Sequence, residues 1–236
     1  MTEYHVERQP TRVFRHEWNT RICHWVNAVA IGFLFVSGWA ILLDYPELYW
    51  GQVGFFGHEP AFRLADWGIT LEGNRQWGRN IHFLYAWVFT INGLVYLIWN
   101  FARRRAREKL LPTREQLTLE HLRTDIGEHL RLRTPRGAAA ARYGSLQKLA
   151  YLGVLFFLAP LMVLSGLAQS PAVVAGCPEL LELFGGKQSA RTIHFIGMLL
   201  FVLFFLVHVF QVFLMGAVNE IRAMITGWFR LPERKP

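Results

Sequence analysis

Cysteine is scarce in this 236-residue sequence, and the two that occur, Cys23 and Cys177, lie in separate segments. Two isolated cysteines match no zinc or iron–sulfur spacing and no disulfide framework. Cys23 precedes a histidine, but attachment of a c-type haem needs a second cysteine three positions earlier, where Thr20 stands. The sequence therefore predicts neither a cysteine-based metal site nor a covalently bound haem.

Charged residues are also scarce, and four long stretches contain none. The uncharged runs cover residues 22–43, 80–102, 149–170 and 192–215. A helix needs about 20 apolar residues to cross a hydrocarbon core of about 30 Å, so each run is long enough. Because 53% of the residues are apolar and 15% aromatic, the chain is predicted to be a membrane domain rather than a soluble globule.

We predict an all-α fold, an integral membrane four-helix bundle that forms a single domain over residues 1–236. Its helices are expected at about 22–43, 80–102, 149–170 and 192–216, with Pro160 kinking the third. The first run is too long for the core of a signal peptide, and no small-residue cleavage site follows it. We therefore expect this run to remain in the mature protein.

Lysine and arginine are distributed unevenly between the two sides of the predicted bundle. Twenty of the 25 lie in residues 1–21, in the loop 103–148 and in the tail after 216, and the other five lie in or at the ends of the loops 44–79 and 171–190. Basic residues concentrate in the cytoplasmic loops of membrane proteins. We therefore predict an N-in, C-in topology with loop 103–148 in the cytoplasm. The net charge of +8 then reflects topology rather than binding of nucleic acid.

Four of the nine histidines lie within the apolar runs: His24, His82, His194 and His208. Fourteen residues separate the last two, so on one helix they share nearly the same face and lie about 21 Å apart along the axis. The predicted topology places His82 and His194 near the outer side of the membrane (the outer pair) and His24 and His208 near the inner side (the inner pair). Two facing imidazoles can ligate a low-spin b-type haem, so these depths predict two stacked haem sites.

Other interpretations of the histidines remain open. Each intramembrane histidine could instead hydrogen-bond a neighbouring helix, as polar residues inside membranes usually do. Zinc is disfavoured, because no carboxylate shares these depths to complete a tetrahedral set. The remaining histidines lie in polar segments, where we expect solvent exposure: His5, His16, His58, His121 and His129.

A short internal repeat relates the two halves of the chain. FVSG at 35–38 matches VLSG at 163–166, and RNIHF at 79–83 matches RTIHF at 191–195. This pattern is typical of two copies of a helical hairpin, each contributing one histidine of the outer pair. The repeat fails at the inner pair, because Leu152 corresponds to His24 and Tyr96 corresponds to His208.

Longer motifs around these histidines resemble a known family. RICHW at 21–25, RNIHF at 79–83, and ARTIHF followed by LVHVFQVF in the last run are similar to the di-haem cytochrome b subunits of membrane oxidoreductases. That family includes the gamma subunit of respiratory formate dehydrogenase and the cytochrome b subunits of nickel–iron hydrogenase and thiosulfate reductase. FGGKQSARTIHF at 184–195 and GAVNEIRAMITGWF at 216–229 most resemble the thiosulfate-reductase-like branch.

The resemblance implies a cofactor set and a ligand set. Members of the family lie in the bacterial inner membrane, bind two haem b groups, and exchange electrons between quinone and a catalytic partner bearing molybdopterin, nickel–iron or iron–sulfur centres. The positions that match the family's haem ligands are His24, His82, His194 and His208, with the pairing that depth predicts.

The resemblance also indicates a quinone region beside the inner haem, near the start of the third helix. The matching segment is YGSLQK at 143–148, in which Tyr143 and Gln147 follow the formate dehydrogenase pattern, whereas Gly144 and Leu146 depart from it. We predict quinone contacts for Tyr143 and Gln147, with anchoring at the membrane interface as the alternative.

Three arginines are candidates for contact with haem propionates. Arg21, Arg79 and Arg191 each stand three residues before a predicted ligand. A guanidinium group pairs well with a carboxylate, and snorkelling to the interface is the alternative for each. The Trp-bearing loop 44–79 is the predicted docking surface for a partner, although tryptophan is also common at membrane interfaces.

We therefore predict a membrane-anchoring di-haem b subunit, which transfers electrons within an oxidoreductase complex and does not carry the substrate-converting site itself. Its partners would be ubiquinone or menaquinone, membrane lipid, and a periplasmic catalytic or iron–sulfur subunit. Two alternatives are a stand-alone quinol oxidoreductase of the cytochrome b561 type and a haem-free membrane anchor or transporter subunit.

Overall fold

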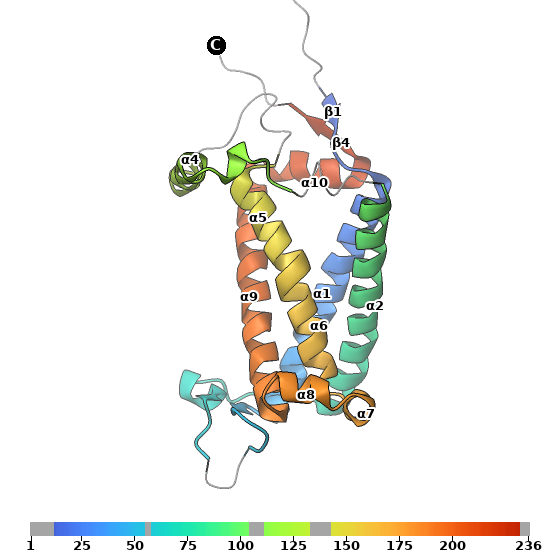
Figure 1. Ribbon diagram of the computed structural model, residues 1–236, viewed down its shortest axis with the longest axis vertical. Helices are drawn as coiled ribbons and strands as arrows, with labels where there is room; N and C mark the ends of the chain where they lie inside the picture. The colour runs from blue at the N-terminus through green and yellow to red at the C-terminus, as the bar shows by residue number, and fades with distance from the viewer. Residues whose placement is uncertain (1–11, 55–57, 104–110, 133–142, 232–236) are drawn as a thin grey trace, which may run out of the picture.

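The computed structural model describes residues 12–54, 58–103, 111–132 and 143–231. Within these residues four long helical segments form a bundle (Figure 1). They are α1 (Trp18–Asp44), α2 (Arg75–Ala102), a third segment (Ser145–Leu167) and α9 (Lys187–Leu214), all long and apolar enough to cross a membrane. The predicted all-α membrane four-helix architecture is confirmed.

The helices extend beyond the uncharged runs at their starting ends. Each begins four or five residues earlier than predicted, because a membrane helix continues from the hydrocarbon core into the polar headgroup layer, where charged residues are tolerated. The last helix ends at Leu214, two residues before Gly216, whose φ of 96° is not helical. The third helix ends three residues before the predicted boundary.

The third segment contains an irregular turn where a proline kink was predicted. It consists of α5 (Ser145–Gly153), a π-helical turn (Val154–Leu158) and α6 (Ala159–Leu167). Pro160, just after the turn, has no N–H for the carbonyl of Phe156, and its ring crowds that carbonyl. A wider turn relieves this conflict locally, which explains the π-helical geometry.

Short elements cover the two ends of the bundle. One end carries α10 (Ala217–Thr226), which lies across the long helices, and the two-stranded sheet of β1 (Arg12–Phe14) and β4 (Trp228–Arg230) (Figure 1). The opposite end carries α7 (Pro171–Gly176) and α8 (Glu179–Leu183). The remaining elements are β2 (Glu47–Leu48), β3 (Phe62–Arg63), η1 (Leu64–Trp67), η2 (Glu115–Leu117) and α4 (Leu119–Leu130).

The sheet places both ends of the described chain at the same end of the bundle. β1 and β4 are antiparallel, with Val13 opposite Phe229, and the backbone N–H groups of Arg15 and His16 donate to the carbonyl of Gly227. Gly227 has a φ of 88°, and a Cβ there would lie 2.7 Å from Cε2 of Phe14, so only glycine fits this corner. Following the predicted topology, we call this the inner end and the α7–α8 end the outer end.

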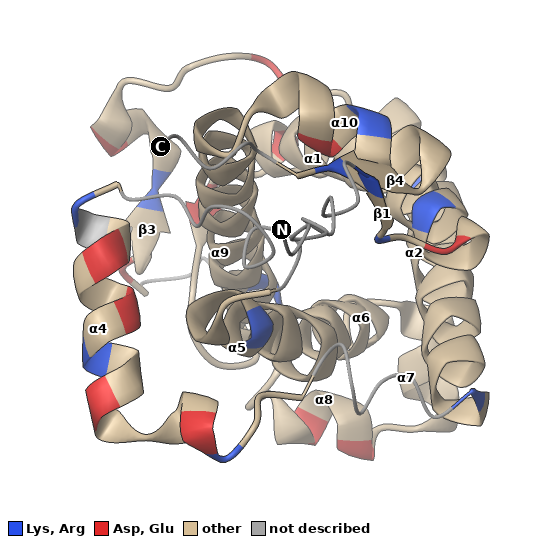
Figure 2. Ribbon diagram, turned by 90° about the horizontal axis from the view of Figure 1, so that it is seen from above, with Lys and Arg blue, Asp and Glu red and all other residues tan. Residues whose placement is uncertain are grey.

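The surface of the bundle is apolar along its length and charged at its ends. Trp87, Ile98, Leu206 and Phe213 are each more than half exposed on the long helices, where they would contact lipid. Figure 2 shows most of the charged residues on the short end elements, including α4, α8, α10 and the β1–β4 sheet.

α1 and α2 pack closely at Gly78, which yields a prediction about stability. A Cβ on Gly78 would lie 2.9 Å from both Cγ1 of Ile41 and the backbone oxygen of Ser37. Gly78→Ala is therefore expected to force the helices apart and to destabilise the protein by about 1–3 kcal/mol. Gly153→Ala is the matched control, because a Cβ there meets no atom within 4 Å and this glycine does not line the cavity between the helices. Thermal unfolding in detergent should lower Tm for Gly78→Ala alone, and equal Tm values for the two variants would refute the close contact.

Candidate cofactor site

The helices enclose a large cavity of about 2390 Å³. Its lining extends from Arg15 and Glu220 at the inner end to Arg79 and Arg191 at the outer end, and it includes all four histidines of the long helices. A pocket for one small ligand usually measures about 300–1,000 Å³. The cavity therefore has room for more than one ligand of that size.

The outer pair of histidines is brought together by α2 and α9. The ring centroids of His82 and His194 lie 6.1 Å apart, with the ring planes at 65°. Behind each ring lies a serine of the adjoining helix in the same hairpin: Ser37 Oγ is 3.1 Å from Nδ1 of His82, and Ser165 Oγ is 2.9 Å from Nδ1 of His194. The short sequence repeat is thus also a repeat of side-chain contacts.

A glycine follows each of these serines and lets the histidine ring approach the helix. A Cβ on Gly38 would lie 3.2 Å from Cε1 of His82, and a Cβ on Gly166 would lie 3.3 Å from Cε1 of His194. Small residues are commonly found where membrane helices make close contacts. Here the close contact is between a helix backbone and the back of an imidazole ring.

The inner pair is brought together by α1 and α9. The centroids of His24 and His208 lie 6.2 Å apart, with the ring planes at 56°. His208 stacks on Phe204 at a centroid distance of 5.9 Å, and His24 packs edge to face against Trp25. Nδ1 of His24 is buried and has no hydrogen-bond partner among the described residues.

In both pairs the separation of the ring centroids is close to that expected of two imidazoles that ligate one haem iron. A metal–imidazole bond is about 2 Å long, which puts the centroids of two opposed imidazoles about 6 Å apart. Within the described ranges no group of three His, Cys, Asp or Glu side chains could hold a metal ion, so a tetrahedral protein site is not formed there. A haem iron needs only two axial ligands from the protein, and these residues fit that requirement.

The predicted propionate arginines lie in different environments. Arg21 donates from Nη1 to the carbonyl of Ile225 at 2.7 Å and does not line the cavity. Arg79 lines the cavity with its guanidinium 5.8 Å from the ring centroid of Phe83. Arg191 also lines the cavity, but its guanidinium donates to the backbone carbonyls of Tyr45 and Glu47. Arg191 therefore holds the loop after α1 in place, and its contact with a propionate stays a prediction.

Tyr143 and Gln147 both line the inner part of the cavity, as a quinone site there requires. The hydroxyl of Tyr143 lies 3.5 Å from Nδ1 of His16, and Nε2 of Gln147 donates to the hydroxyl of Tyr151 at 2.7 Å. Lys148 is directed elsewhere, since its Nζ donates to the carbonyl of Leu111.

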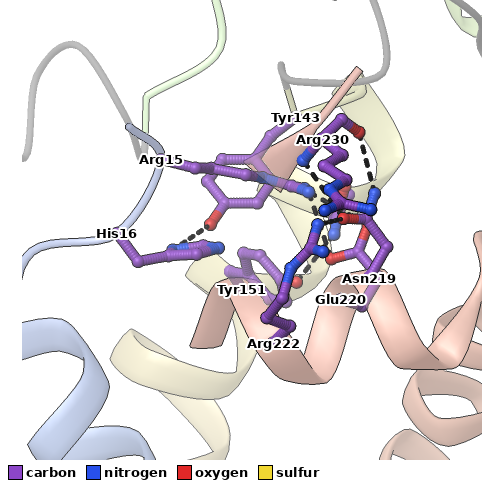
Figure 3. A network of polar contacts seen from close by, with 9 residues as sticks. Arg15, His16, Tyr143, Tyr151, Asn219, Glu220, Arg222 and Arg230 are labelled. Atoms are coloured by element: carbon purple, nitrogen blue, oxygen red, sulfur yellow. Dashed lines mark hydrogen bonds and ion pairs between the residues drawn. The ribbon is translucent and has the colours of Figure 1, made fainter. Parts of the chain in front are cut away.

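The prediction that His16 is exposed to solvent is wrong. Its exposed fraction is only 4%, and Figure 3 shows its ring beside Tyr143. The pairing of β1 with β4 draws the N-terminal segment across the inner end of the bundle and buries this residue. His58, His121 and His129 are exposed as predicted, and His5 lies outside the described residues.

Sequence reasoning missed an ion pair at the inner end of the cavity. Nη1 of Arg15 donates to both carboxylate oxygens of Glu220, at 3.0 and 3.1 Å, and only 7% and 15% of the two side chains are exposed (Figure 3). The Arg15 guanidinium also lies over the rings of Tyr143 and Phe229. The partners are 205 positions apart, and no local pattern could have paired them. Ser37 and Ser165 were also missed as contacts, although the FVSG and VLSG repeat pointed to them.

Comparison with known proteins agrees with this geometry. A family model described as prokaryotic cytochrome b561 matches residues 15–227, which include all four long helices and both histidine pairs. The chain belongs to the prokaryotic cytochrome b561 family. It is a haem b membrane subunit of the bacterial inner membrane, and the resemblance seen in the sequence is confirmed at the level of the family. This membership disfavours the haem-free alternative.

Three relatives show the range of proteins to which this cytochrome is similar. The putative protein-methionine-sulfoxide reductase subunit YedZ1 of Azospira oryzae is 35% identical over 209 residues, which cover 88% of this chain and 93% of that protein. Probable Ni/Fe-hydrogenase B-type cytochrome subunits of Cupriavidus necator and Azotobacter vinelandii are each 26% identical. These two matches cover 90% and 97% of this chain and 85% and 93% of the respective relatives. The closer likeness to a thiosulfate-reductase-like branch stays a prediction.

Proposed function

We propose that this cytochrome holds two haem b groups, one between His82 and His194 and one between His24 and His208. The observation that carries the proposal is the presence of two histidine pairs, with centroids 6.1 and 6.2 Å apart, in one cavity. Haem supplies reversible one-electron redox chemistry at each site. The long apolar helices position the four histidines along this cavity.

We further propose that the subunit passes electrons between a quinone at the inner end and a catalytic partner at the outer end. The polar residues that line the inner cavity support the quinone assignment, because a quinone accepts hydrogen bonds at its carbonyl oxygens. Burial raises the pKa of Tyr143 well above its ordinary value, so its phenol keeps its proton and can donate such a bond. Gln147 and Tyr151 lie beside it in the same cavity.

A catalytic partner is supported by the relatives and by the outer surface. The relatives' names describe them as subunits of a hydrogenase and of a protein-methionine-sulfoxide reductase, which indicates that cytochromes of this kind work within larger redox complexes. In the loop between α1 and α2, Trp50 and Trp67 are 54% and 59% exposed. Large exposed aromatic side chains are common anchors of protein interfaces, so this loop is the proposed docking surface.

The test is a haem count on the purified full-length protein together with reduction by a soluble quinol. A pyridine haemochromogen assay should give about two haem b per chain, and a menaquinol or ubiquinol analogue should reduce them. Gln147→Ala should slow reduction by the quinol without changing the haem count. One haem per chain would refute the double site, and haems that dithionite reduces but neither quinol reduces would refute the quinone assignment. Full activity without any co-purifying partner would favour a stand-alone quinol oxidoreductase.

A further inference from the structure

The two histidine pairs differ in the hydrogen bonds that their ring nitrogens make to the rest of the protein. In the outer pair both Nδ1 atoms contact a serine hydroxyl. In the inner pair Nδ1 of His24 has no partner, and no hydrogen bond joins the His208 ring to another residue in the described part of the chain. The inference drawn from this contrast concerns the residues behind the outer pair, and it rests on the two-haem function proposed above.

The direction of the serine–histidine hydrogen bonds follows from the single proton on each hydroxyl. Ser37 Oγ lies 2.6 Å from the carbonyl oxygen of Phe33, one helical turn earlier, and donates its proton there. It can then only accept from His82, so Nδ1 of His82 carries the proton. A neutral imidazole protonated on Nδ1 has its lone pair on Nε2, the atom left to bind a metal.

The second hairpin repeats the arrangement. Ser165 Oγ donates to the carbonyl oxygen of Met162 at 3.3 Å and accepts from Nδ1 of His194 at 2.9 Å. Both serines have an exposed fraction of 0%, so water does not compete for either contact. Ser165 donates to the residue three positions earlier and Ser37 to the residue four positions earlier, and with each hydroxyl proton on a backbone carbonyl both outer histidines have the same tautomer.

We propose that Ser37 and Ser165 are positioning residues that lower the reduction potential of the outer haem. A hydrogen bond donated by the non-ligating nitrogen fixes the ring orientation and makes the ligating nitrogen more basic. A more basic ligand stabilises ferric iron relative to ferrous iron, and hydrogen bonding of this kind is an established means of tuning haem potentials. Because each serine acts on one of the two ligands of the same iron, their effects should add on one haem and spare the other.

The experiment is a redox titration of purified Ser37→Ala, Ser165→Ala and the double variant, followed by optical and EPR spectra of each haem. Loss of one hydrogen bond should shift the reduction equilibrium of one haem by about three- to tenfold, which is about 28–59 mV towards higher potential for a one-electron couple. The double variant should shift the same haem by the sum. His82→Ala identifies that haem, because the haem this variant retains is the inner one.

Ser145→Ala is the matched control. Ser145 is as fully buried as the two positioning serines, but its hydroxyl has no hydrogen-bond partner among the described residues, and so is not hydrogen-bonded to a histidine there. The reduction potentials of both haems in Ser145→Ala should equal those of the unaltered protein. The inference would be overturned if the shifts fell on the inner haem or did not exceed those of Ser145→Ala. The proposed function would still stand in that case, provided that the wild-type protein contained two haems. A wild-type count other than two would overturn the proposed function itself.

Discussion

Replacing His194 with alanine is expected to abolish one haem site completely and to leave the other intact. The centroids of the His82 and His194 rings lie 6.1 Å apart, so in the proposed outer site the loss of either ring would leave the iron with one protein ligand. The Soret absorbance per chain should fall to about half, because one of two b-type haems is lost. His82→Ala should give the same spectrum and the same remaining potential.

The other half of this prediction concerns the inner pair. His24→Ala and His208→Ala should remove the second haem and retain the first, since their centroids lie 6.2 Å apart at the opposite end of the cavity. His58→Ala is the control, because that histidine is exposed in the loop between α1 and α2, does not line the cavity and should leave the haem count unchanged. The pairing is wrong if His82→Ala and His208→Ala leave haems of identical potential.

The second large effect is expected at the buried ion pair of Arg15 and Glu220. This pair links the segment after β1 to α10, and both side chains are largely buried at the inner end of the bundle (Figure 3). Breaking a buried ion pair by removing one of its partners typically costs about 3–5 kcal/mol. Glu220→Ala should therefore lower Tm by roughly 6–20 °C in a thermal unfolding measurement on the detergent-solubilised protein.

Two comparison variants separate the charge effect from the loss of packing. The double variant Arg15→Leu with Glu220→Leu should recover much of the loss, because apolar residues of similar volume can replace a buried pair at little cost. Arg63→Gln removes a partner from the exposed pair with Glu47, in which 42% of the arginine side chain is accessible, and should cost less than about 1 kcal/mol. If Glu220→Ala and Arg63→Gln lower Tm equally, the inner ion pair has no special structural role.

The sequence was informative about the outer histidines because their surroundings are repeated. FVSG and VLSG predicted two similar hairpins, and in the structure each motif supplies a serine and a glycine to the histidine of its own hairpin. The sequence pattern did not reveal what the motif does, because small residues also serve ordinary close packing in membrane helices. Only the positions of Nδ1 and Oγ distinguished the two roles.

The sequence was least informative at the inner end. His16 lies in a polar segment and was expected to be exposed, yet it is buried beside Tyr143. Arg15 and Glu220 lie in charged segments near opposite ends of the chain. Their contact depends on the pairing of β1 with β4, two strands of three residues each that have no distinctive pattern of their own.

The sequence by itself determined the four long apolar helices and predicted the depths of the histidines along them, because hydrophobic length and the 1.5 Å rise per helical residue are local properties. The tertiary structure alone decided which side chains surround those histidines: Ser37 behind His82, Ser165 behind His194, and the Arg15–Glu220 pair at the inner end. These contacts join segments separated by 29 to 205 positions. They form only once the helices have packed and the chain ends have paired, so no local stretch of sequence contains them.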